Sequence, residues 1–89
     1  MKILIKKKAG RRLKIIAGQI QGLAKLVELE KYCIDILNQS MAIKSALSGV
    51  DDLILENHLS THVIEQVKNG QKEKAVKEIL TVYKLSKRK

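Results

Sequence analysis

Residues 32–68 constrain the fold most, because they form one long stretch with almost nothing to break a helix. The chain has no proline, and this stretch holds a single glycine, Gly49. The pattern predicts one helix of about 37 residues, which at about 1.5 Å per residue is about 55 Å long. Its apolar positions recur at helical spacing and include Ile34, Leu37, Met41, Leu47, Val50, Ile54 and Val67.

Two shorter helices flank this stretch. Apolar residues repeat at three- and four-residue steps between Leu13 and Val27, and again between Ala75 and Tyr83. Residues 28–31 interrupt the pattern, and Asn69-Gly70 is typical of a helix C-terminus. The composition, with 2% aromatic residues and no proline, does not suit an all-β fold. We expect an all-α protomer of three helices in one domain, residues 1–89, with flexible ends at residues 1–8 and 85–89.

The central helix is too long for one protomer to cover. A compact domain of this length has a radius of gyration of only about 12 Å. The first and third helices are too short to bury the whole apolar surface of the second. We therefore expect an obligate homo-oligomer built on an antiparallel four-helix-bundle dimer.

Positive charge is concentrated at the start of the chain. The net charge is +9. Residues 1–27 hold no acidic residue, whereas the remainder is nearly neutral. Such a block attracts a polyanion, nucleic acid first and an anionic membrane surface second; the alternative is a solvated helix face. The basic residues of this block are Lys2, Lys6, Lys7, Lys8, Arg11, Arg12, Lys14 and Lys25.

The single cysteine and the hydropathy pattern indicate the compartment. One cysteine excludes an intrachain disulfide framework and fits a reducing environment. No apolar run approaches the roughly 18 residues of a membrane span. The short apolar stretch at residues 3–5 leads directly into lysines and does not resemble a signal-peptide core. These features predict a soluble cytoplasmic protein.

Cys33, His58 and His62 form a candidate metal site. The two histidines are four residues apart, so both imidazoles lie on one helix face. From Cys33 to His58 the helix turns through about 2,500°, within about 20° of whole turns, so the cysteine shares that stripe. Along the axis, however, Cys33 and His58 are about 37 Å apart. One chain therefore cannot bring all three to one ion.

Two antiparallel copies can complete the site. If the central helices cross near Ala46 and Leu47, Cys33 of one copy meets the histidine pair of the other. A dimer then has two equivalent intersubunit sites. One thiolate with two imidazoles suits Cu(I) or Zn(II) better than a hard cation. The competing interpretation is a buried cysteine and two surface histidines without a metal.

Three segments resemble the CsoR family of copper-sensing bacterial repressors, which belong with the RcnR-type metal-responsive repressors. They are residues 12–22 (RLKIIAGQIQG), 32–39 (YCIDILNQ) and 56–62 (ENHLSTH). The resemblance covers roughly residues 6–83. It implies an all-α dimer of dimers that binds operator DNA when metal-free. It also implies release on binding one Cu(I) per protomer, bridging two protomers, which derepresses copper efflux genes.

The resemblance also assigns roles to single residues. Cys33 and His58 match the family's ligands, and His62 lies where copper sensors carry cysteine or histidine. Tyr32 and Glu78 match residues that surround the ligands in copper-responsive members. Arg12 and Lys14 match basic positions of the family's first helix that are implicated in operator binding. From their positive charge in this sequence, we expect Arg11 and Lys44 to contact operator DNA as well.

The chain departs from the family pattern at several positions. Ile15, Ala17 and Gln21 stand where members often carry arginine, glutamate and arginine, and Gly49 lacks a basic side chain that many members have. These changes affect operator sequence and binding strength rather than the metal site.

Other functions remain open on the sequence. The alternatives are a sensor of nickel, cobalt or zinc on the same scaffold, and an oligomeric metal-binding bundle without DNA function. An enzyme is disfavoured, because a catalytic zinc needs a general base and a substrate cleft. Operator sequence, target genes, metal selectivity and the choice of dimer or tetramer are not determined by the sequence.

Overall fold

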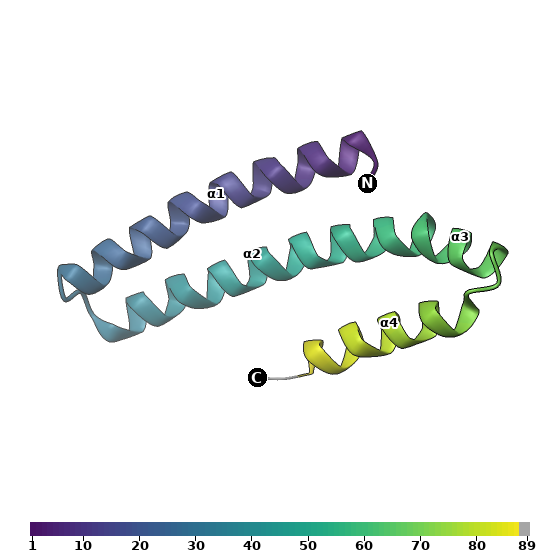
Figure 1. Cartoon of the computed structure of the whole chain (residues 1–89). Coiled ribbons are helices and arrows are strands. Elements are labelled where there is room, and N and C mark those ends of the chain that lie inside the picture. Colours follow the sequence, from purple (N-terminus) through teal and green to yellow (C-terminus); the bar gives the residue numbers. More distant parts are fainter. Residues whose placement is uncertain (88–89) are drawn as a thin grey trace. The chain divides into compact units, whose positions relative to one another are not determined.

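All regular structure in the described residues, 1–87, is helical. The computed structural model contains α1 (Ile3–Glu28), α2 (Cys33–Ser60), α3 (His62–Lys68) and α4 (Lys72–Ser86), in that order (Figure 1). No strand occurs within residues 1–87. The all-α prediction is confirmed. The chain divides into two compact units, residues 1–55 and 56–89.

The first unit is an antiparallel helix pair. Figure 1 shows α1 folding back along α2 after a short turn. Ala9 and Ile16 of α1 meet Ile43 and Val50 of α2 in a small buried cluster. Both pairs are seven residues apart, two helical turns, so each helix presents its apolar stripe to the other. Partly buried Leu23, Ala46 and Leu53 extend this cluster.

The turn between these helices is a Schellman motif. The N–H of Lys31 donates to the Leu26 carbonyl, and the N–H of Glu30 donates to the Val27 carbonyl, both at 3.0 Å. Glu30 takes the left-handed conformation that this motif requires, with φ of 52°. The chain therefore turns where residues 28–31 interrupt the apolar pattern, although Glu28 still belongs to α1.

α1 begins earlier than the apolar repeat indicated. It starts at Ile3, so residues 3–8, expected to be flexible, are helical. The N–H of Lys6 donates to the Lys2 carbonyl at 3.0 Å, which extends helical bonding to the start of the chain. The chain has no proline, so no residue before Leu13 prevents the helix from starting at Ile3. At the other end Leu85 and Ser86 belong to α4, while residues 88–89 of the expected flexible end lie outside the described residues.

The predicted central helix is interrupted once. α2 ends at Ser60 and α3 begins at His62, with Thr61 between them at φ −124° and ψ −74°. The Thr61 hydroxyl donates to the Asn57 carbonyl at 2.6 Å, and the Ser60 hydroxyl donates to the same oxygen at 3.2 Å. Such side-chain bonds compete with the helical ladder and bend helices. The segment predicted as one helix over residues 32–68 is thus two helices joined at Thr61.

The second unit comprises the end of α2 with α3 and α4. α3 and α4 pack against each other across the turn at Asn69 and Gly70. Gly70 has φ of 76°, which explains the glycine, and the N–H of Gln71 donates to the Gln66 carbonyl at 2.6 Å. Ala75 of α4 is buried, as is Asn57 of α2. The predicted C-cap and the third predicted helix, here α4, are both confirmed.

Few apolar side chains are buried in the described part of one chain. The buried ones are Ala9, Ile16, Ile43, Val50 and Ala75. On α2, six large apolar side chains stay exposed: Ile34, Leu37, Met41, Leu47, Ile54 and Leu59. Within residues 1–87, no helix has the length and apolar character needed to cross a membrane.

Candidate metal centre

His58 and His62 face each other across the Thr61 break. Their Nδ1 atoms are 3.3 Å apart, and the ring centroids are 5.3 Å apart with the planes at 69°. His58 lies in the last turn of α2, and His62 is the first residue of α3. The predicted pairing of the two imidazoles is therefore present, although the two histidines belong to different helices.

The second ring nitrogen of His58 faces a carboxylate. His58 Nε2 is 3.3 Å from Oε2 of Glu78, a residue of α4. The side chains are partly exposed, 29% for His58 and 40% for Glu78. A carboxylate at this nitrogen holds the ring orientation and the Nε2–H tautomer, which keeps Nδ1 available as a ligand. The structure thus places Glu78 beside His58.

Gln66 is a member of this cluster that the sequence did not reveal. Its Nε2 donates to Oε1 and Oε2 of Glu78, at 3.4 and 3.5 Å. Gln66 is the fourth residue after His62 on α3, so the two share one helix face. That spacing is the only sequence signal for Gln66, and glutamines at this spacing are common on helices. The contact depends on how α3 and α4 pack.

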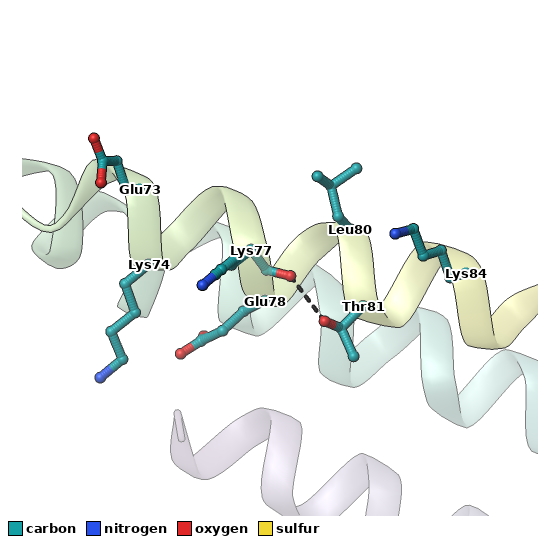
Figure 2. Close-up of a pocket in the computed structure, with 7 residues that line it drawn as sticks. All are labelled: Glu73, Lys74, Lys77, Glu78, Leu80, Thr81 and Lys84. Carbon is teal, nitrogen blue, oxygen red and sulfur yellow. Dashed lines mark hydrogen bonds between the residues drawn. The ribbon is translucent and has the colours of Figure 1, made fainter.

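Figure 2 shows the α4 side chains around Glu78. Lys74, Lys77 and Lys84 surround an open hollow on this helix, together with Thr81 and Glu78. The Thr81 hydroxyl donates to the Lys77 carbonyl at 2.9 Å (Figure 2). Glu73 also lines this hollow, so α4 contributes Glu78 to the histidine cluster from a surface with three lysines and two glutamates.

Tyr32 and Cys33 lie at the opposite end of α2. Cys33 is its first residue and carries an exposed free thiol. Tyr32, also exposed, accepts hydrogen bonds through its carbonyl from the N–H groups of Asp35 and Ile36, at 3.0 and 3.2 Å. Tyr32 thereby starts the helix that presents the thiol. No three cysteine, histidine or acidic side chains gather as a metal site in the described part of one chain. The intersubunit site stays a prediction.

The predicted nucleic-acid contacts fall on two different faces of the first unit. Arg11 and Lys14 line a hollow on α1 with Lys6, Lys7 and Gly10. Arg12 extends instead to α2, where its Nη1 atom lies 4.0 Å from the position of a Cβ on Gly49. The Arg12 guanidinium thus lies beside Gly49, the position at which many family members carry a basic side chain. Lys44 is exposed on α2.

The histidine pair fits a metal ion of the size and ligand preference of copper or zinc. Two nitrogens bound to one zinc at about 2.0–2.1 Å in tetrahedral geometry lie about 3.4 Å apart. The observed Nδ1–Nδ1 distance is 3.3 Å, and in the metal-free chain it is a hydrogen bond in which one Nδ1 carries the proton. A metal bound by both nitrogens would replace that proton. Imidazole nitrogens with a thiolate are ligands that Cu(I) and Zn(II) accept. The side chains present therefore suit either ion.

Comparisons with known proteins agree with this chemistry. The profile of a family described as metal-sensitive transcriptional repressor matches residues 5–84. The copper-sensing transcriptional repressor CsoR of Bacillus subtilis (strain 168) is 41% identical over 73 residues, which are 82% of this chain and 72% of that protein. The copper-sensing transcriptional repressor RicR of Mycobacterium tuberculosis (strain ATCC 25618 / H37Rv) is 43% identical over 60 residues, or 67% of this chain and 62% of RicR.

A solved structure has the same fold. The crystal structure of the copper-sensing repressor CsoR with Cu(I) from Geobacillus thermodenitrificans NG80-2 matches with a TM-score of 0.90 and 35% identity. The match covers 99% of this chain and 92% of that one.

Proposed function

Because this chain belongs to the family of metal-sensitive transcriptional repressors, we propose that it is a repressor that responds to Cu(I). Metal-free, it binds operator DNA, and Cu(I) binding releases it so that copper efflux genes are transcribed. The observation that carries the choice of metal site is the 3.3 Å approach of the His58 and His62 Nδ1 atoms, with Glu78 at the other nitrogen of His58. The relatives named as copper-sensing support the choice of copper.

The complete site combines two protomers. Cys33 of one protomer supplies the thiolate, and His58 with His62 of the other supply two imidazole nitrogens. The exposed thiol at the start of α2 and its exposed apolar side chains support this pairing. Each protomer binds one Cu(I), which when bound links the two subunits through soft ligands. The family resemblance favours two such dimers in a tetramer.

Glu78 and Tyr32 act around the ligands. Glu78 holds the His58 ring through Nε2, which leaves Nδ1 to face His62. Tyr32 adjoins the Cys33 thiolate of the same protomer and joins the cluster when the partner docks. Since Glu78 belongs to α4, any change in the His58 ring is transmitted to that helix.

The DNA-binding surface is basic and lies on α1 and α2. Arg11 and Lys14 are exposed and adjoin Lys6 and Lys7, so they offer several positive charges to phosphates. Arg12 and Lys44 add charge on the α2 side. A repressor of this kind acts where its DNA is, in the cytoplasm, where the thiol also stays reduced. The protein has no enzymatic role in this proposal.

One observation favours a second candidate, a zinc-responsive repressor on the same scaffold. The ligand set has two imidazoles to one thiolate, and the spacing of the two Nδ1 atoms suits tetrahedral zinc. A sensor of nickel or cobalt is a weaker alternative, because Cys33 brings a soft ligand to the site.

A binding experiment tests the function directly. A duplex selected from random DNA by the metal-free protein is titrated under anaerobic, reducing conditions, with no metal, with Cu(I) and with Zn(II). We expect tight metal-free binding that Cu(I) weakens strongly and Zn(II) weakens little. Release by Zn(II) alone selects the second candidate, and failure to bind any duplex overturns both.

A further inference from the structure

We propose that Gln66 is a positioning residue that holds Glu78 against His58 and so determines how strongly metal binding acts on α4. This inference rests on the proposed function, because it assigns a role within the same cluster. All of its side chains lie in the second compact unit, residues 56–89. They come from three helices: His58 from α2, His62 and Gln66 from α3, and Glu78 from α4.

The Glu78 carboxylate is held from two sides. His58 Nε2 approaches its Oε2 at 3.3 Å, and Gln66 Nε2 approaches both oxygens, at 3.4 and 3.5 Å. One bond alone leaves a carboxylate free to turn about its own torsion, whereas donors from two helices fix its plane. Because Glu78 remains 40% exposed, water would otherwise compete for these oxygens.

The orientation of the Gln66 amide follows from the charge beside it. Its Oε1 atom is buried and accepts no hydrogen bond within the described residues, which is an unfavourable state for an amide oxygen. Rotating the amide by half a turn would point this oxygen at the negative carboxylate and remove the donor. The structure therefore keeps the NH₂ group on Glu78 and leaves the oxygen unsatisfied. The unsatisfied oxygen is the cost of directing the NH₂ donor at the Glu78 carboxylate.

The position of Gln66 connects the ligands with α4. His58 and His62 lie on opposite sides of the Thr61 break, so an ion bound by both fixes the angle between α2 and α3. Gln66 is one turn after His62 and moves with it. A change in that angle shifts the Gln66 donor relative to Glu78, while His58 holds the same carboxylate from α2. Through Gln66, the position of the Glu78 carboxylate thus depends on His62 as well as on His58.

The metal-free protein gives a first test that needs neither copper nor DNA. In ¹H–¹⁵N spectra, the side-chain NH₂ resonances of Gln66 should shift when Glu78→Gln removes the charge that they contact. The control Glu73→Gln removes a charge from an exposed residue of the same helix and should leave these resonances in place. Resonances that respond to neither variant, or equally to both, overturn the contact.

The second test measures the coupling. Gln66→Leu keeps the size and removes the donor, and Glu65→Leu places leucine at an exposed neighbour on α3. We expect Gln66→Leu to bind one Cu(I) per protomer with affinity within about tenfold of the unsubstituted protein. Its copper-induced loss of affinity for the selected duplex should be smaller by about 2- to 30-fold. Glu65→Leu should respond like the unsubstituted protein.

A double-variant cycle separates positioning from a merely structural role. If Gln66 acts through Glu78, then adding Gln66→Leu to Glu78→Ala should change the copper response no further. Additive losses would mean that Gln66 acts by another route and would overturn the proposal. A normal copper response in Gln66→Leu would overturn it as well. If the unsubstituted protein itself neither binds Cu(I) nor leaves DNA, the proposed function fails, whereas the Gln66–Glu78 contact is still judged by the spectra.

Discussion

The Nδ1 atoms of His58 and His62 face each other at 3.3 Å across Thr61, the residue between α2 and α3. Two imidazoles four residues apart on an unbroken helix move together as one rigid face. Here Thr61 separates them, and both its N–H and its hydroxyl donate to the Asn57 carbonyl, at 3.1 and 2.6 Å. In the proposed site, the two ligands of this pair therefore belong to different helices, His58 to α2 and His62 to α3.

The contribution of each ligand can be separated by substitution. Cys33→Ala should abolish tight Cu(I) binding, because the thiolate is the softest ligand available. His62→Ala should weaken binding less, since Cys33 and His58 still provide two ligands. Competition with a Cu(I) chelator under anaerobic conditions measures both affinities. Equal losses in the two variants would show that the thiolate is not the dominant ligand.

Assembly is expected from the exposed apolar side chains of α2. Ile34, Leu37 and Met41 are at least half exposed in the single chain, which is unfavourable in water. The protein should therefore be a dimer or larger at micromolar concentration, with the tetramer favoured by the family. Sedimentation velocity measures this, and Met41→Lys should shift the distribution toward smaller species. A folded monomer would exclude the intersubunit site.

DNA affinity should fall steeply with salt, because binding of basic side chains to phosphates releases counterions. Arg11→Ala, Arg12→Ala and Lys14→Ala should each lower the slope of log affinity against log salt by about one for each phosphate that the variant no longer neutralises. Lys31→Ala, in the turn before α2, serves as the control with the same change of charge. An unchanged slope in all three α1 variants would remove that helix from the interface.

Two glycines should respond in opposite ways to alanine. At Gly49, inside α2, an added Cβ would lie 4.0 Å from Arg12 Nη1, an ordinary contact, so alanine should raise stability by about 0.5–1 kcal/mol. At Gly70, φ of 76° disfavours any Cβ, and alanine should lower stability by about 1 kcal/mol. Urea denaturation of the assembled protein measures both. A loss of stability at Gly49 would indicate that Arg12 cannot accommodate even a methyl group.

Helical periodicity predicted most of the fold because it needs only local information. Residue type and spacing predict three features: the turn near residues 28–31, the helix C-cap at Gly70 and helix α4. They do not predict the break at Thr61, because serine and threonine also occur inside helices, and the sequence does not show that the hydroxyls of Ser60 and Thr61 donate back to the Asn57 carbonyl.

The candidate site was predictable where its residues share one helix face. The pairing of His58 and His62 follows from a four-residue spacing, whereas family resemblance assigns Glu78 and the sequence pattern does not single out Gln66. Both of the latter reach the cluster through the packing of α3 and α4, which the sequence pattern does not specify. Contacts of Cys33 with the histidines involve a second chain and stay predictions.

Removing the carboxylate at His58 should separate metal binding from the response to metal. Glu78 touches His58 through the nitrogen that faces away from His62, so Glu78→Ala leaves Cys33, His58 and His62 as ligands. Cu(I) affinity should fall by no more than about 10- to 100-fold, as for other residues that orient a ligand.

The DNA response of this variant should change more than its affinity for copper. Linkage requires copper to weaken DNA binding by the same factor as DNA weakens copper binding, typically about 5- to 150-fold. Without Glu78, the His58 ring has no carboxylate through which to act on α4, so this factor should fall toward one. Titration of the selected duplex at saturating Cu(I) measures it, with Glu73→Ala as the α4 control. Full release of DNA from copper-saturated Glu78→Ala would mean that the metal acts on the DNA-binding surface by a route that bypasses α4.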